Sequence, residues 1–188
     1  MKIIDLPPQD EHAIEQVAAL LVEVFTPYSW STMEEALEEV RESLVSERIS
    51  RIAVDSKRTI LGWIGGIPEY DGNVWELHPL VVRPKYQRQG IGRQLVADLE
   101  EQAKARGGVT LTLGTDDHAN LTSLGGIDLY PNVLEHLMNI RNLKGHPYEF
   151  YQKVGFTIVG IMPDANGPGK PDIYMAKCLY ERRRLSET

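Results

Sequence analysis

The sequence feature that most limits how this chain can fold is a glycine-bearing loop between an apolar strand pattern and a helical pattern. Residues 74–82 are mostly apolar, and apolar side chains recur at helical spacing over residues 91–106. The basic loop between them carries two glycines, Gly90 and Gly92. Such a loop directs backbone N–H groups toward one point, where the helix N-terminus adds about half a positive charge. The segment therefore predicts a strand, loop and helix with a phosphate or pyrophosphate site. The alternative is a tight turn with glycines for steric reasons.

The loop matches neither of two better-known phosphate motifs. The dinucleotide fingerprint needs a third glycine where Leu95 stands, and the P-loop sequence is absent. The pattern Gln-x-x-Gly-x-Gly over residues 87–92, after Arg83-Pro84, resembles the pyrophosphate loop of the GCN5-related N-acetyltransferases (GNAT superfamily), which hold acetyl-CoA. The residues expected to bind this cofactor are Leu80, Val81, Val82, Gln87, Arg88, Gln89, Gly90, Ile91, Gly92 and Arg93.

Composition and charge limit the partners. The length of 188 residues fits one domain over residues 1–188, and no apolar run is long enough for a membrane span. The net charge of −7 argues against nucleic acid and fits a cationic small molecule. The single cysteine, Cys178, is expected to be a buried, inert thiol in a reducing cytoplasm. The five histidines show no spacing that indicates a metal site.

The order of the predicted elements indicates the fold class. Helical periodicity covers residues 11–25, 32–46, 91–106, 128–143 and 147–154. Strand patterns cover residues 48–55, 60–68, 74–82, 109–113, 156–161 and 172–179, after a first strand at the N-terminus. This order matches the GNAT fold, an α/β (α+β) fold. We expect a mixed, mostly antiparallel sheet with helices on both faces and a splayed central strand pair.

The strand over residues 74–82 carries polar residues where a buried strand should have none. Alternation places Glu76 and His78 on one face, and Pro79 predicts a bulge or a loss of pairing because it cannot donate to the ladder. Exposed backbone groups beside the bulge could pair with a pantetheine arm, and the N–H of Leu80 could polarise an acetyl carbonyl. We predict that Glu76 and His78 bind an amine substrate and handle its proton. The alternative is a solvated glutamate and a structural histidine.

A second motif lies near the C-terminus. The sequence Phe-Tyr-x-Lys-x-Gly-Phe, residues 150–156, looks like the late GNAT motif whose tyrosine lies near the cofactor sulfur. The leaving thiol has a pKa of about 8.5 against about 10 for tyrosine, so a tyrosine can donate a proton or hydrogen bond to it. Tyr151 is the predicted general acid; a core aromatic residue is the alternative.

Longer blocks resemble the aminoglycoside 6′-N-acetyltransferases, in particular the chromosomal Gram-positive subgroup of about 180 residues. These blocks are residues 75–82, 113–117, 128–130, 146–151, 164–167 and 170–173. The resemblance implies acetyl transfer to the 6′-amine of aminoglycosides, a capacity for antibiotic resistance, and a homodimer. It also implies that Glu76 and His78 touch the amine or its proton path. Because aminoglycosides are polycations, Asp116 and Asp117 are expected to bind the aminosugar rings, and Tyr70, Tyr28 and Trp30 to line the same site.

The predicted enzyme is therefore an aminoglycoside 6′-N-acetyltransferase that works by direct attack. Glu76 is the expected base, His78 orients it, and neither a metal nor Cys178 is needed. Two alternatives stay open: a GNAT enzyme for another amine, such as a polyamine or a protein N-terminus, and a non-catalytic acyl-CoA sensor.

Overall fold

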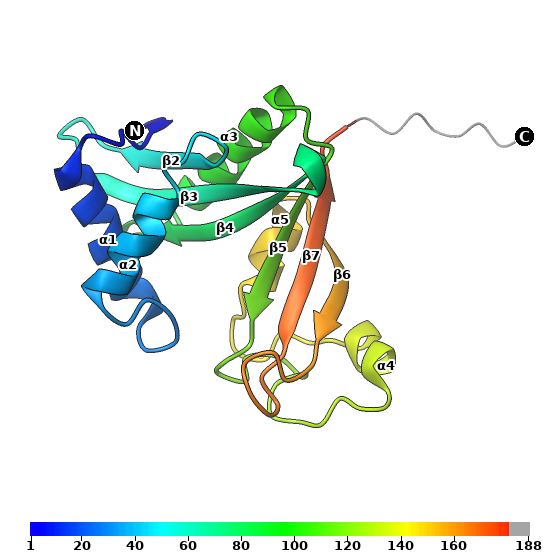
Figure 1. Ribbon diagram of the computed structural model, residues 1–188. Helices are drawn as coiled ribbons and strands as arrows, with labels where there is room; N and C mark the ends of the chain where they lie inside the picture. The colour runs from blue at the N-terminus through cyan, green and yellow to red at the C-terminus, as the bar shows by residue number, and fades with distance from the viewer. Residues whose placement is uncertain (181–188) are drawn as a thin grey trace, which may run out of the picture. The chain divides into compact units, whose positions relative to one another are not determined.

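Residues 1–180 of the chain are described by a computed structural model (Figure 1), and these residues form two compact units that meet in the sequence between Leu111 and Thr112. The first unit holds four antiparallel strands that pair in chain order. Its strands are β1 (Lys2–Asp5), β2 (Ile49–Val54), β3 (Ile60–Glu69) and β4 (Val74–Val82). Its helices are α1 (Glu11–Phe25), α2 (Met33–Glu42) and α3 (Ile91–Ala105), with short 3-10 helices η1 (Tyr70–Gly72) and η2 (Pro84–Tyr86).

Local sequence signals fix where the first two helices begin. The Asp10 side chain accepts a hydrogen bond from the backbone N–H of Ala13 and caps α1. Thr32 and Glu35 form a capping box at the start of α2, each side chain accepting from the other's backbone N–H at 3.2 Å. Helix α2 ends at Glu42, earlier than the expected residue 46. The capping box at Thr32 ends the loop between α1 and α2, which carries Trp30.

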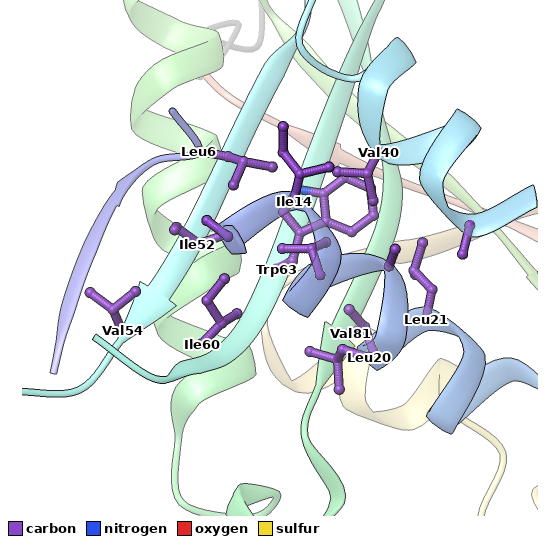
Figure 2. Packing of buried hydrophobic residues seen from close by; sticks show 14 residues of the cluster. Leu6, Ile14, Leu20, Leu21, Val40, Ile52, Val54, Ile60, Trp63 and Val81 are labelled. Carbon is purple, nitrogen blue, oxygen red and sulfur yellow. The ribbon is translucent and has the colours of Figure 1, made fainter. Parts of the chain in front are cut away.

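Helices α1 and α2 cover one face of the β1–β4 sheet. Trp63 on β3 is fully buried, and Figure 2 shows it among Ile14, Val40 and Leu21 from the two helices. Burial of such side chains from water stabilises each by about 1.5–3 kcal/mol. The position of α2 over the sheet is therefore set by the same core that holds β3 and β4.

Helix α3 packs on β2, β3 and β4 through leucines that face glycines. A Cβ atom at Gly62 would lie 3.1 Å from the Leu95 side chain, and one at Gly66 would lie 2.7 Å from that of Leu99. Glycine at these two positions lets α3 approach the sheet closely. The N-terminus of α3 is thus held just beyond the end of β4.

The second unit contains an antiparallel pair of strands, β6 (Thr157–Met162) and β7 (Asp172–Cys178), and two short helices. Helix α4 spans Val133–Met138, α5 spans Tyr148–Lys153, and β5 spans Thr110–Asp116. The expected helix over residues 128–143 is wrong in length, because Pro131 stands before it and the chain leaves it at Asn139 to pair Asn142 with Thr122.

The mixed α/β fold and mostly antiparallel strand pairing are as predicted. Cys178 is exposed, with its thiol 3.3 Å from the Tyr180 carbonyl oxygen, which contradicts the expected buried thiol. Over residues 1–180, no helix is both long enough and apolar enough to cross a membrane. The single domain and the splayed strand pair stay predictions.

Candidate active site

Strand β4 alternates strictly between buried and half-buried residues. Trp75, Leu77, Pro79 and Val81 are buried, whereas Glu76, His78 and Leu80 are half-buried. The prediction that Glu76 and His78 share one face of this strand is therefore confirmed. A carboxylate and an imidazole two residues apart can both reach one small ligand group.

The predicted bulge is present and lies at His78–Pro79. In the β3–β4 register, Ile64 pairs with Leu80 and Gly66 pairs with Leu77, so two residues of β4 oppose Gly65 alone. A Cβ atom at Gly65 would lie 2.1 Å from the carbonyl oxygen of His78. Only glycine leaves room for this carbonyl, so Gly65 fixes the backbone that carries His78.

Two further residues converge on His78 from the α1–α2 region. The Glu39 carboxylate on α2 lies 3.8 Å from the imidazole Nε2. The Trp30 ring meets His78 edge-on, with centroids 5.8 Å apart, and also meets Phe25 at 5.0 Å. Trp30 was an expected site residue, but Glu39 was not, because its helical pattern is that of an ordinary solvated face. Only packing of α2 over β4 brings Glu39 to the histidine.

The charges of this cluster shift one another's ionisation. Burial raises the pKa of Glu76, and the nearby His78 partly opposes that effect. The interaction with Glu39 raises the pKa of His78 against the opposing effect of burial. Burial opposes ionisation of Glu39, yet His78 and Trp30 together lower its pKa. The cluster thus holds one firmly ionised carboxylate, one histidine biased toward its cation and one carboxylate of raised basicity.

An acidic cavity of about 430 Å³ adjoins this cluster through Glu39 and Trp30. Four carboxylates from α2 line it together with aromatic and hydroxyl side chains of the preceding loop. The lining residues are Tyr28, Ser29, Trp30, Ser31, Glu35, Glu38, Glu39 and Glu42. A cavity of this size with several carboxylates and two aromatic rings suits a polar cation.

The glycine loop has the geometry of an anion site. Arg88 and Gly90 adopt left-handed backbone conformations, with φ of 60° and 84°, and Gly90 is the N-cap of α3. No side chain caps this helix, so its first backbone N–H groups are not bound by a capping side chain. Arg88 and Arg93 are exposed beside it. The residues present fit a diphosphate at this helix N-terminus.

Gln87 and Gln89 hold the loop itself. The Gln87 amide donates to the Val82 carbonyl at 3.0 Å, and the Gln89 amide donates to the Lys85 carbonyl at 3.3 Å. These bonds connect the loop to the end of β4 and to η2. Both glutamines shape the loop through their side-chain amides.

Tyr151 lies on α5, in the second unit. It is half-buried between Phe150 and Phe156, with ring centroids at 5.2 Å and 5.8 Å. Burial raises the pKa of this phenol, so it stays protonated at neutral pH. The raised pKa opposes full transfer of the Tyr151 proton, whereas the protonated hydroxyl can still donate a hydrogen bond.

His146 connects the start of α5 to the end of β5. Its Nδ1 accepts from the Tyr148 backbone N–H at 3.2 Å, so Nε2 carries the proton and donates to the Asp116 carbonyl at 3.1 Å. Burial lowers the pKa of His146, which favours this neutral form. The helix bearing Tyr151 is thus tied to the strand end bearing Asp116.

The other predicted substrate residues differ in exposure. Asp116 is exposed, its carboxylate accepts from the Asn166 amide, and it lies 3.7 Å from His118. Asp117 is fully buried and accepts from the Leu121 and Thr122 backbone N–H groups and the Thr122 hydroxyl. This carboxylate holds its own turn, so we keep only Asp116 as a proposed ligand of the substrate.

Tyr70 lies apart from the acidic cavity. It begins the η1 turn between β3 and β4, and 76% of its surface is exposed. The cavity lining does not include it. Within residues 1–180, no group of three or more His, Cys, Asp or Glu side chains is arranged to hold a metal ion.

Comparison with known proteins decides the family. The model of the acetyltransferase (GNAT) family matches residues 14–130. The chain belongs to the GNAT acetyltransferase family. Curated proteins compared by sequence gave no match.

Solved structures narrow the group within this family. An aminoglycoside 6′-N-acetyltransferase complexed with coenzyme A is 41% identical over 97% of this chain and 99% of that one, with a TM-score of 0.91. The Enterococcus faecium aminoglycoside 6′-N-acetyltransferase is 42% identical over the same shares, with a TM-score of 0.88. An aminoglycoside 6′-acetyltransferase type Ii is 37% identical over 97% and 100%, with a TM-score of 0.75. The predicted resemblance to this group is confirmed.

Proposed function

We propose that this GNAT protein transfers the acetyl group of acetyl-CoA to the 6′-amine of aminoglycosides. The observation that carries the proposal is the acidic cavity lined by α2, whose Glu39 lies 3.8 Å from His78 at the β4 bulge. Aminoglycosides are polycations, and the four carboxylates of this cavity would bind their amines. The 37–42% identity to aminoglycoside 6′-N-acetyltransferases over 97% of the chain supports the same substrate.

The reaction needs a neutral amine. An alkylammonium has a pKa near 10, so the acceptor first loses one proton, which Glu76 takes directly or through one water. Its raised pKa makes Glu76 a stronger base than an exposed glutamate. The amine nitrogen then attacks the thioester carbon, and the Leu80 N–H is our proposed donor to the developing oxyanion.

Collapse of the tetrahedral intermediate breaks the carbon–sulfur bond. The nitrogen gives its second proton to solvent, and the thiolate leaves with the bonding electron pair. Tyr151 supplies a hydrogen bond to this sulfur, and the coenzyme A thiolate takes its proton from solvent. The proposed diphosphate ligands are the loop residues 87–93, with Leu80, Val81 and Val82 along the pantetheine. Acetyl-CoA, when bound, supplies the activated acetyl group.

We also propose a homodimer, a cytoplasmic location and a capacity for aminoglycoside resistance. Exposed apolar side chains support the homodimer: Leu134 and Met138 on α4, and Val159 and Met162 on β6. Light scattering behind size exclusion tests the homodimer. Expression in a susceptible bacterium, with the inhibitory concentration of kanamycin as readout, tests resistance.

Release of coenzyme A thiol tests the substrate. With acetyl-CoA, kanamycin and tobramycin should release thiol, amikacin should react too, and gentamicin components without a usable 6′-amine should react poorly. Spermidine and a peptide N-terminus serve as controls for a GNAT enzyme of another amine. A sensor would bind acetyl-CoA without releasing thiol. Absence of release with every 6′-amino aminoglycoside would refute the proposed function.

A further inference from the structure

Glu39 on α2 lies beside His78 although 38 residues separate them in the sequence. The contact joins Glu39 Oε2 and His78 Nε2 at 3.8 Å, and only 18% of the Glu39 side chain is exposed, against 40% for His78. Residues this far apart in the sequence meet only through tertiary packing of the helix on the bulged strand. The contact is set by the core that packs α2 on the sheet.

The setting of Glu39 explains why its carboxylate stays in place. Ala36 and Val40, on the same face of α2, are fully buried. A carboxylate at the margin of this core is costly without partners. Glu39 finds them in His78 and Trp30, which together lower its pKa despite burial. The Trp30 ring also packs edge-on against His78, which restricts the imidazole from a second side.

We propose that Glu39 is a positioning residue that holds the His78 ring with Nε2 toward α2, next to Glu76. The role of this pair in acetyl transfer rests on the proposed function. A protonated His78 ring cannot take a proton from the substrate ammonium, and Glu76 is then the base. The same cation favours the ionised form of Glu76, which is the form that accepts the proton.

The charged groups around His78 agree with this assignment. Glu39 from α2 raises the pKa of His78 most, burial opposes it, and Glu76 on the same strand raises it further. Arg48, which follows α2, opposes them as a like charge. Loss of the Glu39 charge should therefore shift His78 toward the neutral ring.

The test is an NMR titration of the His78 ring proton at Cε1 in the free protein, assigned with His78→Asn. Glu39→Gln should lower the His78 pKa by about one pH unit, because an opposite charge at this distance shifts a pKa by roughly that amount or more. Glu39→Asp should restore part of the difference. Glu34→Gln, on the same helix but outside the cavity lining, removes an equal charge and should leave the titration unchanged.

Kinetics provide the second readout. Glu39→Gln should lower kcat about tenfold, or about 1.4 kcal/mol. KM for kanamycin should rise no more than about threefold, because three other carboxylates line the acidic cavity. An unchanged His78 titration, or a rise in KM with kcat intact, would overturn the proposal. If wild-type protein acetylates no aminoglycoside, the proposed function fails by itself, and the titration still decides whether Glu39 holds the histidine.

Discussion

Replacing Gly65 with alanine should damage the site through the backbone, without changing any side chain that touches a ligand. The added Cβ atom would lie 2.1 Å from the His78 carbonyl oxygen, more than an ångström closer than an ordinary contact. The clashing atom is backbone, so no side-chain rotation can relieve it. Either β3 separates from β4 at the bulge or His78 moves by about an ångström.

Both routes have a measurable cost. Overpacking of this kind destabilises proteins by about 1–3 kcal/mol, and a backbone clash belongs at the upper end. The melting temperature should therefore fall by roughly 6–12 °C in a protein of this size. A shift of about 1 Å at a catalytic residue can cost about a hundredfold in rate, so kcat/KM for kanamycin should fall by that order.

Gly66→Ala is the matched control. Its Cβ atom would meet the tip of the Leu99 side chain at 2.7 Å, which can turn aside. We expect a smaller fall in melting temperature and kcat/KM within about fivefold of wild type. The assays are differential scanning fluorimetry and thiol release under identical conditions. A Gly65→Ala protein as stable and active as wild type would refute the account of the bulge.

Three further predictions concern single roles in the reaction. Tyr151→Phe removes one hydrogen bond to the leaving sulfur, so it should lower kcat about tenfold to a hundredfold with little change in the acetyl-CoA KM. Where chemistry limits turnover, an unchanged kcat would refute this role of Tyr151. Glu76→Gln should lower kcat/KM at least about a hundredfold. In wild type, burial raises the Glu76 pKa, so activity should be present above that pKa and lost as pH falls through it, a limb absent from the variant's profile. The double variant Arg88→Ala, Arg93→Ala should raise the acetyl-CoA KM about tenfold at low salt, because each exposed charge contributes roughly 0.7 kcal/mol to binding. The control Lys104→Ala, at the far end of α3, should leave this KM unchanged.

The sequence predicts most of the fold because its signals are local. The capping box at Thr32 and Glu35, the strand alternation of Glu76 and His78, and the proline of the bulge all act within a few residues. The helix expected over residues 128–143 was overextended because periodicity alone does not register the stop at Asn139.

The sequence could not predict contacts that depend on packing between distant elements. Glu39 looks like any solvated glutamate of α2, and only the core around Ala36 and Val40 brings it to His78. Asp117 looks like its neighbour Asp116, yet its side chain is fully used by the turn at Thr122. A pair of adjacent aspartates carries no sequence signal that separates a structural carboxylate from an exposed one.

The position of the acetyl group in the product tests the central claim most directly. Kanamycin carries several amines, and a positioned base beside one acceptor nitrogen should modify only one of them. Tandem mass spectrometry and NMR of the product should place a single acetyl group on the 6′-nitrogen. Acetylation at another amine, or a mixture of positions, would contradict the account.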